Sequence, residues 1–187
     1  MLSWAGKEIL LKIVALVMPN YAMNIYLLPN ELCRELEVMI NSFWWRSNHS
    51  GGKGLTWVRW EYLCKPEGCG GLDFKQLYLF NIVMLGKQLW QLLTCLDSLM
   101  AKILKARYYP QTSILQASLG HNPSYVWCSI LAAKEVVIQG SRVRVGSGQT
   151  ISISKYTWLS DLNDCFISSN LNEELATASI SSIMMCN

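Results

Sequence analysis

Apolar residues recur at three- and four-residue intervals along most of the first three quarters of the chain, the spacing of one face of an α-helix. The first such segment covers residues 3–17, and Ser3 has the short polar side chain that caps a helix N-terminus. The positions predicted to face inward are Ala5, Ile9, Ile13 and Leu16. On this pattern Lys7 and Lys12 turn toward solvent.

A second helix is predicted over residues 29–45, with Pro29 at a first-turn position, where its missing N–H costs nothing. Its predicted inward positions are Leu32, Leu36, Met39, Ile40 and Phe43, and its predicted outward positions are Arg34, Glu35 and Glu37. Residues 48–54 (NHSGGKG) then have the composition of a flexible loop. A short strand at residues 55–58, a brief helix at 60–64 and a turn at 66–71 are expected next.

The longest predicted helix covers residues 74–93, after an Asp73 and Gln76 pair at capping-box spacing. The positions predicted to face inward are Leu79, Ile82, Val83, Gly86, Trp90 and Leu93. The pattern leaves Lys75, Asn81, Gln88 and Gln91 mostly outside that face.

Two shorter helices follow. One covers residues 97–109, with Asp97 as its cap and Pro110 as its end. Its predicted inward positions are Leu99, Ile103 and Ala106, and its outward face carries Lys102 and Lys105. The other helix is predicted over residues 122–139 and is stopped by Gly140.

Residues 141–154 (SRVRVGSGQTISIS) alternate strictly on both sides of a glycine turn, which predicts a β-hairpin. Val143 and Val145 would face the isoleucines of the second strand, and Arg142 and Arg144 would project from the opposite face. Beyond Trp158 no period is visible, so weak order is expected there. The predicted fold class is mainly α, with helical bundle-like segments and a short β-hairpin near the C-terminal end.

The charge is unevenly distributed. Residues 1–158 hold all 16 Lys and Arg but nine acids, a net +7, whereas residues 159–187 hold four acids and no base, a net −4. A basic body permits contact with phosphates without requiring it. Seven cysteines, an odd number without recurring spacing, indicate reduced thiols in an intracellular compartment.

The residues that catalysis requires are missing from the pattern. No two acidic residues are paired on a strand-like apolar run, so polymerase, nuclease and ribonuclease H chemistry are unsupported. Cys64 and Cys69, with His49 or His121, lack the second ligand pair of a zinc site. The GSGQT turn lacks a Walker lysine, and nothing selects a catalytic triad. The sequence therefore predicts no catalytic residue, no metal and no cofactor.

Basic residues interleaved with aromatic ones are the pattern that favours a ligand, because cations bind phosphates and rings stack on unpaired bases. Three clusters have this pattern: Trp44, Trp45 and Arg46; Trp57, Arg59 and Trp60; and Lys102, Lys105, Arg107 and Tyr108. The alternative is that the tryptophans belong to the core and the charges form a solvated face.

Several phrases in colinear order carry a resemblance: LSWAGKEILLK, MPNYAMNIYLLP, FWWRS, LTWVRWEYLCKP, FNIVMLGKQLWQLL, SLMAKILKARYYP and NPSYVWCSIL. Over residues 2–158 the chain resembles the region after the palm in plant LINE-type, non-LTR retrotransposon reverse transcriptases. It is also similar to short uncharacterised plant mitochondrial proteins of retroelement origin. Trp4 and Cys69 depart from the usual residues of this family, and its palm motif with paired aspartates has no counterpart here.

The resemblance implies a thumb-like helical segment at 1–47, a post-thumb helical region with the hairpin at 48–158, and a weakly ordered acidic tail at 159–187. A thumb holds the template-primer duplex, which adds Lys7, Lys12, Arg46 and Arg59 as candidate backbone contacts. Together the candidate contacts are Lys7, Lys12, Arg46, Trp57, Arg59, Lys102, Lys105, Arg107, Arg142 and Arg144.

The expected function is that of a non-catalytic reverse-transcriptase fragment with weak, sequence-independent binding of RNA or an RNA/DNA duplex through phosphates, and no small-molecule substrate. One alternative is a decayed gene fragment without a selected role. Another is an interaction or membrane-associated protein that uses apolar residues 9–28, which ranks last because Lys12 and Pro19 interrupt that segment. Nucleus, cytoplasm and mitochondrion all stay open, and no oligomeric state is predicted.

Overall fold

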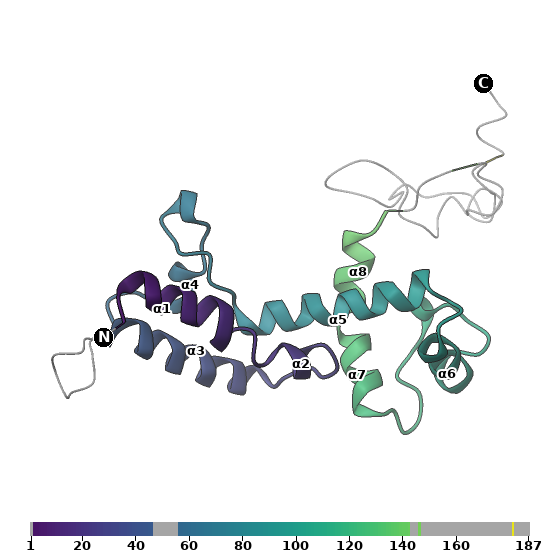
Figure 1. Cartoon of the computed structure of the whole chain (residues 1–187). Coiled ribbons are helices and arrows are strands. Elements are labelled where there is room, and N and C mark those ends of the chain that lie inside the picture. The colour runs from purple at the N-terminus through teal and green to yellow at the C-terminus, as the bar shows by residue number, and fades with distance from the viewer. Residues whose placement is uncertain (1, 47–55, 143–145, 147–180, 182–187) are drawn as a thin grey trace, which may run out of the picture. The chain divides into compact units, whose positions relative to one another are not determined.

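The computed structural model describes residues 2–46, 56–142, 146 and 181, and this part of the chain is mainly α-helical, as predicted (Figure 1). It contains no β-strand within those ranges, so the strand predicted at 55–58 is not formed over its described residues 56–58. The chain divides into two compact units, Met1–Val137 and Ile138–Asn187. The β-hairpin and the acidic tail fall almost wholly on residues outside the described ranges. The predicted divisions at residues 47 and 158 also fall there and stay predictions.

The helices follow one another with short connections. The α-helices are α1 (Trp4–Leu10), α2 (Asn20–Met23), α3 (Asn30–Trp45), α4 (Trp60–Leu63), α5 (Leu77–Thr94), α6 (Leu99–Tyr108), α7 (Tyr125–Ala132) and α8 (Lys134–Gly140). A π-helix, Leu11–Ala15, continues α1, and two 3₁₀ turns lie at Glu67–Cys69 and Ile114–Gln116.

The predicted cap of α1 is confirmed, because the Ser3 hydroxyl accepts a hydrogen bond of 3.1 Å from the Gly6 N–H. The predicted inward stripe is wrong in part. Ile9 and Ile13 are 59% and 63% exposed, and the buried apolar side chains are Leu11 and Leu16. These two residues are five positions apart because the π turn, closed by a Leu16 N to Leu11 O bond of 3.0 Å, adds one residue to the helix.

The first hydrophobic core joins the N-terminal helices to the start of α5. Its buried residues are Leu11, Leu16, Met23, Cys33, Trp44, Trp60, Leu63, Phe74 and Leu77. Phe74 is sandwiched by aromatic rings: Trp60 stacks on it at 5.1 Å and Trp44 meets it edge-on at 5.5 Å. Such pairs add to the stabilisation that burial alone provides.

Helix α3 begins at Asn30, one residue later than predicted, because Pro29 is its N-cap residue, and its inward face also differs from the predicted one. Leu36, Ile40 and Phe43 pack partly against the core. Leu32 and Met39 are 41% and 58% exposed, whereas Cys33, Asn41 and Trp44 are buried. The apolar residues of this helix cover more than one face, so periodicity alone did not select the correct one.

Helix α5 contributes to both cores, and its inward face is rotated from the predicted one. The buried positions are Leu77, Asn81, Leu85, Gly86, Leu89 and Leu92. Leu79, Val83 and Trp90 are instead half or more exposed. Asn81, predicted to lie outside the inward face, is 0% exposed.

Asn81 is buried because it binds the backbone of the connection between α2 and α3. Its Oδ1 accepts from the Leu28 N–H at 2.7 Å, and its Nδ2 donates to the carbonyls of Met23 at 2.8 Å and Tyr26 at 3.0 Å. Ser129 on α7 accepts from the Leu27 N–H at 2.9 Å. A non-helical segment therefore keeps its polar groups paired inside the molecule.

The second core packs α6 and α7 against the C-terminal half of α5 (Figure 1). Its buried residues are Leu89, Leu92, Ala101, Leu104, Tyr109, Ile114, Ala117, Trp127, Ile130 and Val137. Trp127 lies at its centre, 0% exposed, with the Tyr108 ring stacked at 4.7 Å and the Tyr109 ring at 5.6 Å.

Two predicted caps are replaced by other residues. Ser98, not Asp97, caps α6 by accepting from the Ala101 N–H at 3.2 Å. The cap expected from Asp73 on α5 is supplied from another helix, because Glu37 of α3 accepts from the Leu77 N–H at 2.7 Å. The last predicted helix is formed as α7 and α8, which meet at Ala133, and Ser124 caps α7.

No single helix among the described residues has the length and apolarity to cross a membrane. Helices α5 and α6 together satisfy that test only as a pair bent by 90°.

Candidate nucleic-acid interface

The tryptophans of the basic and aromatic clusters differ in burial. Trp44 and Trp60 are buried, 6% and 5% exposed, and Trp45 is half-buried, so these rings belong to the core. Trp57 is 75% exposed. Of these rings, Trp57 has a face that a nucleobase can reach.

A hollow of about 350 Å³ lies between α3 and the start of α4, and Thr56, the residue before Trp57, is part of its lining. Its lining residues are Arg34, Glu37, Val38, Asn41, Thr56, Arg59, Trp60 and Glu61. Arg59 precedes the first residue of α4 and Arg34 lies on α3, and both are exposed. Asn41 holds the approach to α4 by donating to the Val58 carbonyl at 3.3 Å.

Arg34 was predicted only as part of a polar helix side, and the hollow adds it to the candidate site. The sequence signal for Arg34 is a cation on the helix that precedes the segment of Trp57 and Arg59. Its place next to that segment depends on how α3 and α4 pack.

Two carboxylates, Glu37 and Glu61, line the hollow together with the two guanidinium groups and offset their positive charge. Burial raises the pKa of Glu37, while the hydrogen bond from the Leu77 N–H acts in the opposite direction. Because a raised carboxyl pKa means that the buried form holds its proton more readily, this group favours the folded state most at acid pH, and the contribution falls as pH rises through the raised pKa. The predicted outward position of Glu37 is wrong.

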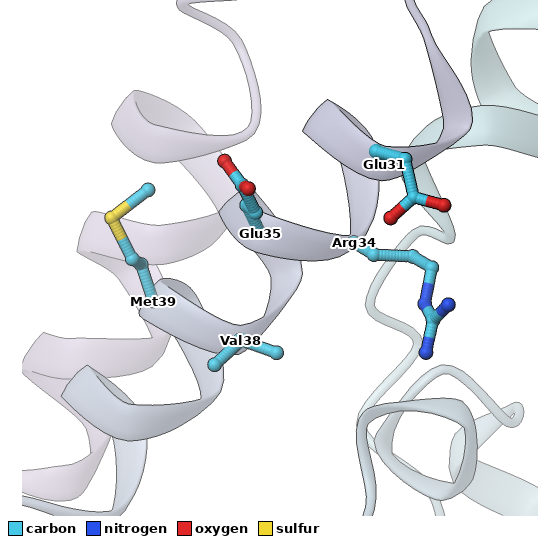
Figure 2. Close-up of a pocket in the computed structure, with 5 residues that line it drawn as sticks. All are labelled: Glu31, Arg34, Glu35, Val38 and Met39. Atoms are coloured by element: carbon cyan, nitrogen blue, oxygen red, sulfur yellow. The ribbon is translucent and has the colours of Figure 1, made fainter.

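Arg34 also borders a second, shallower hollow on the outer face of α3, with Glu31, Glu35, Val38 and Met39 (Figure 2). Figure 2 shows that the side chains of Arg34 and Glu31 leave the helix on one side and those of Glu35 and Met39 on the other. Two carboxylates against one guanidinium group give this second hollow a net negative charge, which makes it a poor site for phosphate.

Helix α6 presents a second group of cations, Lys102, Lys105 and Arg107, all exposed. Lys102 lies 3.9 Å from Asp97, a solvent-exposed pair that neutralises little. The guanidinium of Arg107 lies 5.3 Å from the centre of the Tyr108 ring. Leu99, predicted to face inward, is 74% exposed, so the cations flank an apolar strip.

That apolar strip corrects the predicted packing of α6. Ile103 is 54% exposed and Ala106 is exposed as well, whereas Ala101 and Leu104 are buried. The helix is turned so that its small residue Ala101 approaches the core, which the spacing of the larger residues does not indicate.

Lys7 does not lie at the surface as predicted. It is 7% exposed, and its ammonium donates to the carbonyls of Trp44 at 3.2 Å and Arg46 at 2.6 Å while lying 4.8 Å from the centre of the Trp4 ring. A cation here donates to the free carbonyls at the end of α3 and interacts favourably with the negative end of the helix dipole. Lys7 is a capping residue within the fold and is unavailable to phosphate.

Replacing Lys7 with methionine should lower the free energy of unfolding by about 2 kcal/mol, because one buried and one partly buried carbonyl lose a charged donor. Urea denaturation followed by circular dichroism measures this change. The matched control is Lys87→Met, a lysine exposed on α5, which should change stability by less than about 0.5 kcal/mol. Equal effects from the two substitutions would show that Lys7 has no such role.

Lys12 and Arg46 differ in burial and in pairing. Lys12 is half-buried and paired with Glu8 at 2.7 Å and Glu67 at 3.6 Å, and the hydrogen bond to Glu8 raises the pKa of Lys12. Arg46 is exposed at the end of α3.

The last two candidates belong to the C-terminal unit. Arg142 is exposed and donates to the carbonyls of Gln139 and Ser141. Arg144 lies outside the described residues.

The acidic and thiol groups of the described ranges do not gather. Within those ranges no three His, Cys, Asp or Glu side chains lie close enough to hold a metal ion. Cys33, Cys64, Cys69, Cys95 and Cys128 are free. Burial raises the pKa of the Cys64 thiol to about 12, so this sulfur stays protonated at neutral pH and packs as a small apolar group.

Comparison with known proteins places the chain. It is 34% identical over 147 residues to the Arabidopsis thaliana protein "Uncharacterized mitochondrial protein AtMg00310", a match that covers 78% of this chain and 95% of the relative. The chain belongs to the family of this mitochondrial protein.

A second protein that is similar to this member of the AtMg00310 family is much longer. The chain is 29% identical over 164 residues to the Arabidopsis thaliana "Putative ribonuclease H protein At1g65750". This match covers 85% of the chain but 26% of that protein, so the chain spans about a quarter of its length. No family model and no solved structure matches the chain.

Proposed function

We propose that this member of the AtMg00310 family is a non-catalytic fragment derived from a retroelement reverse transcriptase, from the thumb and the region after the palm, and that it binds RNA or DNA weakly without reading sequence. The longer relative supports this origin, because it is named a putative ribonuclease H protein and the reverse transcriptases that this sequence resembles often carry a ribonuclease H-like domain. The mitochondrial name of the shorter relative favours the mitochondrion as the compartment.

The observation that carries the binding proposal is the exposed Trp57 two residues before Arg59, which shares a hollow with Arg34. An exposed ring within two residues of a guanidinium group can bind unpaired nucleic acid, with a base stacked on the ring and phosphates on the cations. Lys102, Lys105 and Arg107 on α6 offer further phosphate contacts. Binding through these groups is independent of sequence and weakens as salt rises.

Replacing Trp57 with alanine should weaken the affinity for a single-stranded RNA by roughly tenfold, because one base loses its stacking surface. Fluorescence anisotropy with a labelled, unstructured RNA measures the dissociation constant. Trp57→Phe should keep most of the affinity, since phenylalanine also stacks. The matched control is Trp90→Ala, a half-exposed tryptophan on α5, which should leave affinity unchanged.

The salt dependence separates this proposal from adventitious sticking. For the wild type, the logarithm of affinity should fall linearly with the logarithm of salt, and Arg59→Gln should reduce that slope by about 0.7, the loss of one phosphate contact on a single strand. An affinity that is absent, indifferent to salt, or equally reduced by the Trp57 and Trp90 substitutions would contradict the proposal.

A further inference from the structure

An apolar face lies open to solvent along residues 9–21, from the end of α1 through the π-helix and the following turn to the start of α2, and we call it the outer face of α1. We define this face by Ile9, Leu10, Ile13, Val14, Val17, Met18 and Tyr21, whose exposed fractions are 59%, 36%, 63%, 45%, 51%, 76% and 82%. Ile9, Ile13 and Val17 follow one another at four-residue spacing, and Leu10, Val14 and Met18 follow beside them at the same spacing.

This face carries no charge. From residue 9 to residue 28 the single charged side chain is Lys12, which is half-buried and paired with Glu8 and Glu67. The opposite side of the helix is also apolar, since Leu11 and Leu16 lie in the first core. A helix that is apolar on all sides is normally covered on all sides.

Two other groups of exposed apolar residues differ in this respect. Leu99 and Ile103 on α6 are flanked by Lys102, Lys105 and Arg107, and Val38 and Met39 on α3 lie among Glu31, Arg34 and Glu35. Charges of that kind keep a surface solvated or select a charged ligand. The outer face of α1 has no such charges around it, so the partner that covers it must itself be apolar.

We infer that this occupant is the same face of a second copy of the chain, which makes the protein a two-fold symmetric dimer. In such a dimer each copy contributes an identical patch, so an uncharged apolar face is its own complement. Seven large apolar side chains, each roughly half exposed, present on the order of 700 Å² per copy, close to the roughly 800 Å² per partner that a stable interface buries.

This inference does not depend on the nucleic-acid proposal, because Trp57, Arg59 and Arg34 are not part of the face.

Sedimentation equilibrium of the full chain, over a wide range of concentration, should show a reversible monomer-dimer equilibrium. The double substitution Ile13→Glu and Val17→Glu should raise the dissociation constant of the dimer about thirtyfold or more, because it places charges at the centre of the interface. The matched control is Leu79→Glu with Val83→Glu on α5, two side chains that are 58% and 57% exposed, and it should leave the dimer intact. Circular dichroism checks that both variants fold.

Four outcomes would overturn the inference. They are a wild type that stays monomeric, a wild type that forms polydisperse aggregates, a dimer that survives the α1 substitutions, and a dimer that the α5 substitutions weaken equally. Flotation of the monomer with phospholipid vesicles, lost in the α1 variant, would assign the face to a bilayer and would also count against a second copy.

Discussion

Replacing Asn81 with leucine is expected to lower the free energy of unfolding by about 4 kcal/mol, although leucine is the more apolar residue and the site is 0% exposed. The substitution leaves three buried or partly buried backbone groups without the partner that Asn81 supplies, the Leu28 N–H and the carbonyls of Met23 and Tyr26. Each such loss costs about 1–3 kcal/mol. Urea denaturation of the two proteins measures the difference.

The matched control for Asn81 is Gln91→Leu, which makes the same kind of change at an exposed position of the same helix. Its effect should stay within about 0.5 kcal/mol. If Asn81→Leu were as mild as the control, the connection between α2 and α3 would not depend on this side chain, and the observed hydrogen bonds would have little weight in folding.

The second large effect is expected from Trp127→Ala, which should cost about 4 kcal/mol of unfolding free energy. The substitution empties the centre of the second core and leaves the rings of Tyr108 and Tyr109 without the indole on which they stack. Thermal denaturation followed by circular dichroism measures the loss as a lower Tm. Trp57→Ala is the control, because a ring that is 75% exposed loses little burial, and a comparable Tm for the two variants would contradict the described core.

The sequence predicts the existence of the helices better than their orientation. The boundaries of α3 and α6 agree with the pattern to within a few residues, and the Ser3 cap is where its side chain suggests. The buried faces of α1, α5 and α6 do not follow the pattern, because the chain has more apolar residues than the core can hold. Where apolar residues surround a helix, spacing alone leaves several faces equally suitable.

Polar residues account for the remaining errors. Lys7, Glu37 and Asn81 were all predicted outside the core, yet each is buried or half-buried because it pairs backbone groups of a distant segment. The sequence separation in these three contacts is 37, 40 and 58 residues, so no local pattern reveals the partner. Only the packed structure shows that a helix end or a connection needs a side chain at that place.

The candidate site was predicted only in part, because one of its residues comes from a segment that is distant in the sequence. Trp57 and Arg59 are two residues apart and are visible together in the sequence, whereas Arg34 shares a hollow with Arg59 only through the packing of α3 beside α4. The binding role of all three residues stays a prediction until affinity is measured.

The π turn at Leu11–Ala15 has a consequence for how relatives of different length compare. Inserting or deleting one residue in a regular α-helix turns the residues after it away from their buried positions. Insertions and deletions among homologues are therefore usually found in loops. Here one surplus residue is absorbed inside the helix, with Leu11 and Leu16 both still in the core. A homologue shorter by one residue in this turn could therefore form a regular α-helix and keep both leucines in place, and its alignment gap would fall within a helix without marking a loop.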